Sequence, residues 1–174
     1  MLTPEGSNMR ILGVDPALTT TGYGLIDCID NHLQLVEAGI IKTSPRNNLT
    51  IRLEKIHRGI SILLKDTRPD CMVLEKLYAH YRHPTTAFIL GEARGVICLA
   101  SAQAKVPLIE YPATRVKKAI VGRGLAPKYQ IQAMVAKILM IDNPPKYSDV
   151  TDALALAIAH TYFMRVNKQG YINK

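Results

Sequence analysis

The sequence predicts one α/β domain with a five-stranded mixed sheet, three antiparallel strands followed by two parallel ones, flanked by helices. Two patterns indicate this arrangement. Short apolar strands separated by tight turns occupy the first part of the chain, as in an antiparallel meander. Strands then alternate with helical patterns, which is typical of parallel strands joined by right-handed crossovers. The chain has 174 residues, which is long enough to bury a full core.

The first strand is predicted over residues 9–15 and ends on a carboxylate. Ile11 and Val14 suit a central strand that is covered on both faces. Pro16 cannot donate to a β-ladder, and it keeps the preceding Asp15 extended. A carboxylate at the end of a buried strand is costly unless a cation or donors meet it, so Asp15 is the first candidate for chemistry. The plain alternative is that Asp15 and Pro16 only open a turn.

The meander continues with a turn and two further strands. Residues 19–24 are predicted as the turn, in which Gly22 and Gly24 mark places where the backbone bends or approaches another segment closely. The second and third strands are predicted over residues 24–30 and 33–43.

A helix and a fourth strand follow the meander. Apolar residues at helical spacing predict an amphipathic helix from Leu49 to about Lys65. The short apolar strand over residues 71–75 also ends on a carboxylate, Glu75. If this strand lies parallel beside the first one, Asp15 and Glu75 end at the same edge of the sheet, where open sheets hold their active sites.

A long helix predicted over residues 85–104 is apolar almost all round. Such a helix is buried on more than one side. Gly91 and Gly95, four residues apart, would let another backbone come close. We expect one face to pack on the sheet and the other to meet a second subunit; the alternative is a single monomeric core.

The remaining elements are a fifth strand, three helices and their connections. They are predicted over residues 106–111, 113–121, 128–140 and 148–165. We expect a flexible leader at residues 1–8, one domain at residues 9–166 and a frayed tail at residues 167–174.

Two further acids stand three residues apart at the start of the last helix. Asp149 and Asp152 would share one helix face, although acids in a first turn are also ordinary capping residues. Together with Asp15 and Glu75 they would repel one another strongly unless a cation lay between them. Mg²⁺ prefers oxygen ligands, and paired ions can clamp the reacting oxygens of a phosphoryl displacement. The pattern therefore favours metal-assisted phosphodiester hydrolysis.

The composition favours an anionic partner. The chain carries 22 Lys and Arg against 14 Asp and Glu, a net charge of +8, and nucleic acid suits this excess better than a membrane surface. No signal peptide is evident, and each apolar run is interrupted before the ~20 residues that a membrane span needs. Cys28, Cys71 and Cys98 lack metal-ligand spacing, so we interpret them as buried thiols and expect a cytoplasmic protein.

Five short motifs, taken in order and at this spacing, resemble one family. They are Gly13-Val14-Asp15-Pro16 with Thr21-Gly22-Tyr23-Gly24, Leu74-Glu75, Leu90-Gly91-Glu92-Ala93-Arg94-Gly95, Val121-Gly122-Arg123-Gly124, and Asp149-Val150-Thr151-Asp152-Ala153-Leu154-Ala155. On these motifs the chain resembles the RuvC-type Holliday junction resolvases of the ribonuclease H superfamily, over nearly its whole length after the leader.

The resemblance implies roles for particular residues. The four metal-binding acids of the family fall on Asp15, Glu75, Asp149 and Asp152. The family's aromatic residue that contacts bases at the crossover falls on Tyr78, and its two basic residues near the scissile strand fall on Lys117 and Lys128. Ala17 departs from the glycine that the family usually has there, so the loop after the first strand could bend differently.

The resemblance also implies an activity. It implies a ribonuclease H-like fold and a homodimer that cuts a four-way DNA junction by paired symmetric nicks in recombination and repair. It implies two Mg²⁺ ions in each active site, with Mn²⁺ able to substitute, and cooperation with the branch-migration proteins RuvA and RuvB.

Other basic residues and other functions stay open at this point. Arg123, and Arg82 in the loop after Tyr78, are candidate DNA contacts, whereas Arg115 and Lys118 are expected on a solvated face. The alternatives are a ribonuclease H-like nuclease for other branched or RNA-containing duplexes, a nucleotide phosphotransferase of the actin-like fold, for which the chain is too short, and a module that binds junctions without cutting.

Overall fold

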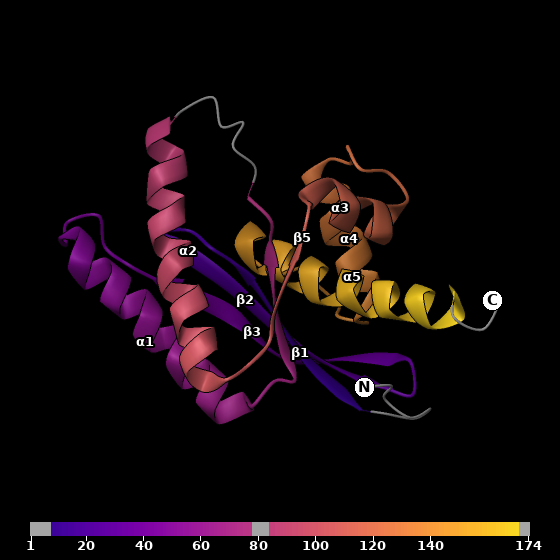
Figure 1. Ribbon diagram of the computed structural model, residues 1–174. Helices are drawn as coiled ribbons and strands as arrows, with labels where there is room; N and C mark the ends of the chain where they lie inside the picture. The colour runs from indigo at the N-terminus through magenta and orange to yellow at the C-terminus, as the bar shows by residue number, and fades with distance from the viewer. Residues whose placement is uncertain (1–7, 78–83, 171–174) are drawn as a thin grey trace.

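The computed structural model describes residues 8–77 and 84–170, which form one mixed five-stranded sheet with helices on both faces (Figure 1). The strands are β1 (Met9–Asp15), β2 (Thr20–Ile29), β3 (His32–Lys42), β4 (Cys71–Glu75) and β5 (Leu108–Tyr111). The helices are α1 (Leu49–Thr67), α2 (Pro84–Ala104), α3 (Ala113–Val121), α4 (Lys128–Ile138) and α5 (Ser148–Gly170).

The sheet has the order β3-β2-β1-β4-β5. β1 pairs antiparallel with β2, and β2 pairs antiparallel with β3. β4 lies parallel to β1 and to β5, so the predicted fold class is confirmed. In the β1–β4 ladder Val14 pairs with Leu74. The next residue of each strand, Asp15 or Glu75, therefore stands at the same edge of the sheet.

Two cores hold the helices to the sheet. α1 and α2 cover one face, where Leu12, Val14, Met72 and Leu74 are buried. α5 covers the other face, with α3 and α4 packed against it (Figure 1). Successive side chains of a strand point to opposite faces. The continuous apolar runs of β1 and β4 are thus explained by burial on both sides.

The turn predicted over residues 19–24 is wrong, because β2 already begins at Thr20. Gly22 and Gly24 pair with Asp15 and Gly13 in the β1–β2 ladder. These glycines serve close packing against another segment and do not bend the chain. The last helix also continues past residue 165 to Gly170, four residues into the segment predicted as tail.

α2 is buried on one side only. Ala93, Ile97 and Ala100 lie in the core, whereas Phe88 and Leu99 are exposed. Over Ala87–Ala104 it is the one described helix that is long and apolar enough to cross a membrane, and 22% of that stretch is buried. The same stretch contains Glu92 and Arg94, and its buried side belongs to the core that α1 shares.

Candidate active site

A flat patch of glycine on the sheet lets α5 lie directly against β1 and β2. A Cβ at Gly13 would overlap the backbone carbonyl of Ala153, and one at Gly22 would overlap that of Asp149. A Cβ at Gly24 would likewise overlap the side chain of Leu154. Side chains at these positions would push the helix away from the sheet. The glycines therefore set the distance between the sheet edge and the first turn of α5.

The alternation of side chains directs the two strand-end acids toward α5. Ile11 of β1 and Val73 of β4 belong to the core on the α5 side. Asp15 and Glu75 follow them at even spacing, so their side chains point to the same face. α5 begins at Ser148, which places Asp149 and Asp152 in its first two turns at this edge. All four acids are partly buried.

The electrostatics of Asp15 and Glu75 indicate that other acids lie near them. Burial, followed by the charges of Asp152, Asp149 and Glu75, raises the pKa of Asp15 to about 7. Burial and the charge of Asp152 raise the pKa of Glu75 as well. Burial and neighbouring acids thus destabilise the charged forms of Asp15 and Glu75, as expected for carboxylates with like charges close by in a desolvated setting.

Lysines from α3 and α4 partly offset this repulsion. The ammonium Nζ of Lys128 lies 3.3 Å from Oδ2 of Asp152. The charge of Asp152 is the main cause that raises the pKa of Lys128. Lys117 acts from α3 and favours the charged form of Glu75. The structure therefore brings both predicted lysines to the predicted acids.

The other basic candidates lie in different settings. Arg123 is exposed and donates to Oε1 of Gln130 at 3.1 Å. Lys118 is exposed as expected. The guanidinium of Arg115 lies 4.3 Å from the centre of the Phe163 ring, so it packs on an aromatic side chain of α5. Tyr78 and Arg82 fall outside the described residues.

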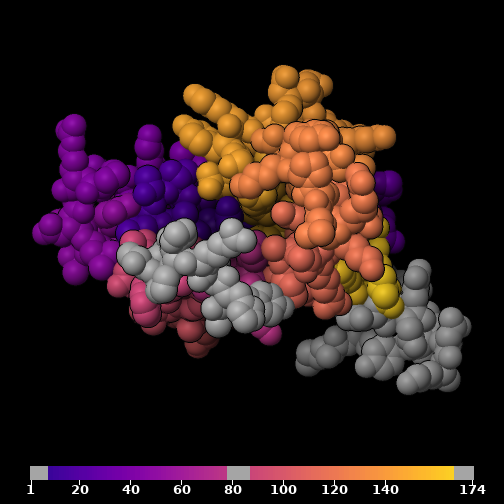
Figure 2. All heavy atoms as spheres, turned by 90° about the horizontal axis from the view of Figure 1, so that it is seen from above, coloured from indigo at the N-terminus to yellow at the C-terminus, as the bar shows by residue number. Residues whose placement is uncertain are grey.

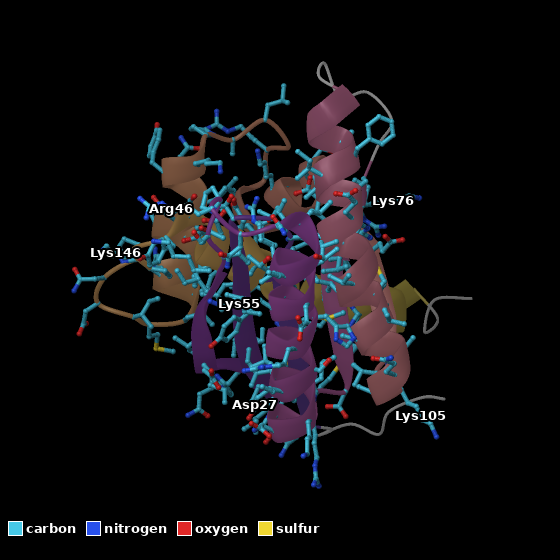
Figure 3. All side chains as sticks on the ribbon, turned by 90° about the vertical axis from the view of Figure 1, so that its left-hand side faces the viewer. Asp27, Arg46, Lys55, Lys76, Lys105 and Lys146 are labelled. Carbon is cyan, nitrogen blue, oxygen red and sulfur yellow. The ribbon has the colours of Figure 1, made fainter. Side chains whose placement is uncertain are left out.

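Figure 2 shows the molecule from above Figure 1. In this view α3, α4 and their loops form the orange part of the surface. A side view places Lys76, which follows β4 directly, in the upper half of the molecule and Asp27 at its lower end (Figure 3). Lys76 therefore lies at the end of β4 that carries Glu75, the edge that Lys117 and Lys128 also approach.

The donor set fits a hard divalent cation, because it consists of carboxylate oxygens, and burial and neighbouring acids raise the pKa of two of them, Asp15 and Glu75. Among the described residues, no three His, Cys, Asp or Glu side chains already lie close enough to hold a metal ion. Instead, the ammonium of Lys128 contacts Asp152. A cation entering the site would relieve the same repulsion that this lysine now partly offsets.

The loop after β1 accommodates Ala17 without strain. In the described part of the chain, the non-glycine residues with positive φ are Asp30, Asn31, Arg68, Lys105 and Met140. Ala17 is not among them, so an alanine is tolerated there. The hydroxyl of the buried Thr21 donates to the carbonyl of Ala17 at 2.7 Å, which ties the loop to β2.

Sequence reasoning gave no role to Arg94. Its guanidinium reaches from α2 to the backbone carbonyl of Glu75 at 2.7 Å and pairs with the carboxylate of Glu110. A basic residue in an otherwise apolar helix was the available signal, since a buried guanidinium needs partners.

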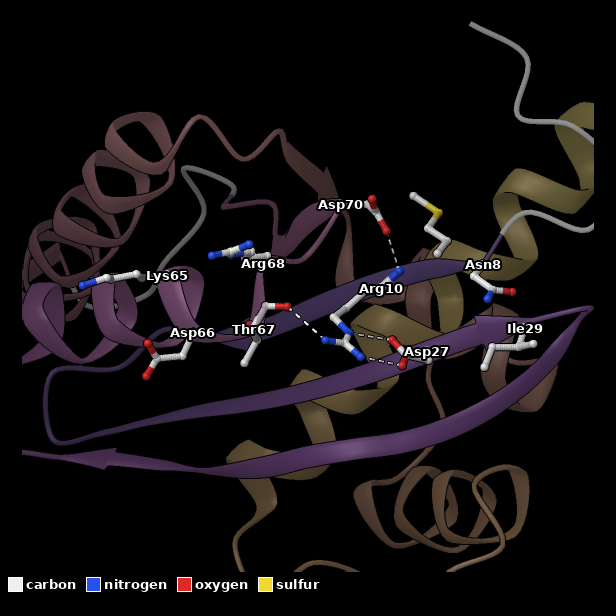
Figure 4. Close-up of a pocket in the computed structure, with 10 residues that line it drawn as sticks. Asn8, Arg10, Asp27, Ile29, Lys65, Asp66, Thr67, Arg68 and Asp70 are labelled. Atoms are coloured by element: carbon white, nitrogen blue, oxygen red, sulfur yellow. Dashed lines mark hydrogen bonds and ion pairs between the residues drawn. The ribbon is translucent and has the colours of Figure 1, made fainter.

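A separate open cavity lies at the opposite end of β1 (Figure 4). Its walls include Arg10, Asp27, Lys65, Arg68 and Asp70. Arg10 is engaged within the protein, because it forms an ion pair with Asp27 and donates to the Thr67 carbonyl at 3.1 Å. None of the four site acids lines this cavity.

Comparison with known proteins identifies the family. The family model described as "Crossover junction endodeoxyribonuclease RuvC" matches residues 11–160. The chain belongs to the RuvC family. The predicted family and enzyme class are thereby confirmed.

Relatives named crossover junction endodeoxyribonuclease RuvC align over most of the chain. The one from Rhodopirellula baltica is 46% identical over 157 residues, which cover 90% of this chain and 88% of the relative. The one from Desulforamulus reducens is 41% identical over 152 residues, covering 87% and 93%.

Solved structures give the same answer for the fold. Thermus thermophilus RuvC in complex with a Holliday junction substrate matches with a TM-score of 0.85 and 31% identity, covering 91% of this chain and 96% of that one. The yeast mitochondrial Holliday junction resolvase Ydc2 matches with a TM-score of 0.59 at 10% identity, which is a likeness of fold alone.

Proposed function

We propose that this RuvC-family chain resolves four-way DNA junctions by metal-dependent hydrolysis at Asp15, Glu75, Asp149 and Asp152. The observation that carries the proposal is the convergence of the strand ends and the start of α5: the β1–β4 register brings Asp15 and Glu75 to one edge, and Gly22 lies against the backbone of Asp149. Burial and the three other acids raise the pKa of Asp15 to about 7, in agreement with this arrangement. Such repulsion among partly buried carboxylates favours a site that is completed by a cation.

The proposed ions are two Mg²⁺ per site, with Mn²⁺ as a substitute. When bound, they would supply Lewis-acid polarisation of the phosphate and activation of the attacking water. The protein's own part is to hold the ligands. β1 and β4 fix Asp15 and Glu75 by the register of their ladder, and α5 brings Asp149 and Asp152 to them.

Lys117 and Lys128 are the proposed phosphate contacts beside the scissile bond. Lys128 has an exposed side chain, 69% accessible, although its ammonium contacts Asp152. It can therefore turn from the carboxylate to a DNA phosphate once a cation neutralises the acids. Arg123 and Lys76, which are both exposed, are further proposed contacts with the DNA backbone. Tyr78 and Arg82 remain proposed contacts with the bases and the backbone at the crossover.

We propose a homodimer that forms through the outer face of α2. Phe88 and Leu99 are exposed on this face, at 73% and 51%. Gly91 and Gly95 lie between them, and a Cβ added at either would meet no atom within 4 Å. Packing within the protomer does not require these glycines, so they suit a close approach by a second copy. Two sites related by a two-fold axis match the paired nicks of a two-fold substrate.

The proposed setting is recombination and repair in the cytoplasm, with RuvA and RuvB as branch-migration partners. Thermus thermophilus RuvC, 31% identical to this chain, is described in complex with a Holliday junction substrate, which supports the choice of substrate.

The test compares a synthetic four-way junction with a linear duplex of the same sequence, each with and without Mg²⁺. Paired symmetric nicks on the junction alone, and only with metal, are expected. Equal cutting of both substrates would support metal-dependent hydrolysis but contradict a preference for four-way junctions. Other branched or RNA-containing duplexes would then be the candidate substrates. Tight junction binding without cutting would leave only a binding module.

A further inference from the structure

Arg94 joins α2 to the end of the strand that carries a catalytic acid. Its Nη1 donates to the backbone carbonyl of Glu75 at 2.7 Å. Its Nη2 pairs with the carboxylate of Glu110 on β5. The side chain of Arg94 is 11% exposed. Its guanidinium is therefore largely removed from water and forms charge-assisted hydrogen bonds with these two partners.

The Glu75 carbonyl lies where the sheet gives little support. Pairing between β1 and β4 ends at Val14 and Leu74, one residue before Glu75. On the other side Glu75 pairs with Tyr111, and the N–H of Lys76 donates to the Tyr111 carbonyl at 2.8 Å. β5 therefore holds one side of this strand end, and Arg94 holds the carbonyl.

Fixing this carbonyl fixes the peptide plane of Glu75 and thereby the direction of its side chain. Carboxylate ligands need placement within about 0.5 Å for productive chemistry. Glu110 in turn orients the guanidinium, and because the guanidinium is planar and rigid, little freedom is lost for each hydrogen bond that it forms. The three groups form a chain from β5 through α2 to the acid.

We propose that Arg94 is a positioning residue for Glu75 and couples the metal-binding edge of the sheet to α2, the helix whose outer face carries the proposed subunit contact. This inference rests on the proposed function, since it takes Glu75 as a metal ligand.

The test is Arg94→Lys in the full chain, measured by direct titration with Mn²⁺ and by junction binding without metal. Lysine keeps the charge that meets Glu110 but cannot hold the carbonyl at the same time. We expect Mn²⁺ binding to weaken about 10- to 100-fold, the usual cost of losing a group that orients a ligand. Junction affinity without metal should stay within about twofold, and the Mg²⁺ needed for half-maximal cutting should rise.

The matched control is Arg10→Lys at the far end of β1. Like Arg94, Arg10 contacts both a carboxylate and a backbone carbonyl with its guanidinium: it pairs with Asp27 and donates to the carbonyl of Thr67 (Figure 4). A general loss of stability would affect both variants, whereas the loss of Mn²⁺ affinity is expected for Arg94→Lys alone. Equal Mn²⁺ affinity in the two variants would overturn the inference.

If Arg94→Lys fails to fold, Glu110→Gln provides the second variant. It removes the ion pair but leaves the Arg94 contact with the Glu75 carbonyl, so a smaller loss of Mn²⁺ affinity in the same direction is expected, and wild-type affinity would contradict the inference. A wild-type chain that neither binds Mn²⁺ nor cuts the junction would refute the proposed function itself. If the wild-type chain binds Mn²⁺ and cuts the junction, and the variant does so equally well, only the role of Arg94 is refuted.

Discussion

Gly22 of β2 lies directly beneath the backbone of Asp149 at the start of α5. A Cβ added at Gly22 would overlap the Asp149 carbonyl and lie 2.7 Å from the amide nitrogen of Val150. Gly22 also pairs with Asp15 across the β1–β2 ladder. One glycine therefore sets the distance between a strand-borne acid and a helix-borne acid of the same site.

Gly22→Ala should lower both stability and cleavage. The added methyl group meets backbone, which cannot move as a side-chain end can, so we expect a loss of about 1–3 kcal/mol. α5 would shift, and Asp149 would move with it. Thermal unfolding and junction cleavage measure the two effects. Gly59→Ala is the control. A Cβ added at Gly59 would lie 2.8 Å from the terminal methyl group of Ile41, which can move aside. Equal stability of the two variants would contradict the packing argument.

Asp15→Asn should abolish cutting and preserve binding. It removes a charged ligand, and even a group that only supports a ligand is worth about 10- to 100-fold, so cleavage should fall by at least about 100-fold. Junction affinity without metal should hold or rise slightly, because a negative charge near DNA is lost. Normal cutting by this variant would show that the metal site lies elsewhere.

The raised pKa of Asp15 predicts how stability depends on pH. A carboxyl whose pKa is about 7 in the folded protein, against an ordinary 3.8, binds its proton more tightly when folded. Its contribution to stability is therefore complete below about pH 4 and is lost as pH rises through 7. In metal-free protein, the stability of Asp15→Asn relative to wild type should rise between pH 4 and 7, by up to about 4 kcal/mol. Urea unfolding in EDTA measures it, and a flat difference would contradict it.

Asp27→Asn is a control for which the stability difference from wild type should depend on pH in the opposite direction. The ion pair with Arg10 lowers the pKa of Asp27, so this carboxylate stabilises the protein above its unfolded pKa and stops doing so as pH falls. The variant should be less stable than wild type at pH 7, and the difference should shrink toward acid pH. The same urea titrations measure it.

Lys128→Ala should reduce cleavage more than Lys118→Ala. Lys128 lies 3.3 Å from Asp152, whereas Lys118 is exposed on α3. Loss of one phosphate contact should reduce the slope of log K against log salt by roughly 0.9, and cleavage should fall by about 100- to 1000-fold. Binding isotherms at several salt concentrations test the first effect. Equal slopes and rates in both variants would remove Lys128 from the DNA-contact model.

Gly95→Leu should separate the proposed subunits without unfolding them. A Cβ at Gly95 meets no atom within 4 Å in the protomer, so the fold should tolerate the larger residue. Bulk at a close helix contact costs about 1–3 kcal/mol, which weakens dimerisation about 5- to 150-fold. Sedimentation over a range of concentrations measures this. Lys55→Leu, on the exposed side of α1, controls for added apolar surface. A wild-type monomer, or an unaffected dimer in the variant, would count against the interface.

The sequence predicted the elements that depend on local patterns. β4 and α3 begin and end at the predicted residues, because apolar runs and nearby breakers decide such boundaries. The second strand was misplaced, because its glycines were read as turn formers. Their actual neighbours, Asp149 and Leu154, lie more than 120 positions away in the chain, and no local pattern reports such a contact.

The sequence by itself predicted which side chains are candidates for the chemistry: acids at two strand ends and at one helix start, with lysines nearby in a basic segment. Only the tertiary structure decided how they meet. The glycines of β1 and β2 let α5 pack directly on the sheet. Because side chains alternate along β1 and β4, Asp15 and Glu75 point to the face that α5 covers. Arg94 reaches the Glu75 carbonyl from α2, on the opposite face of the sheet. Spacing along a chain fixes periodicity, whereas convergence of distant segments depends on packing between layers, which a linear pattern does not encode.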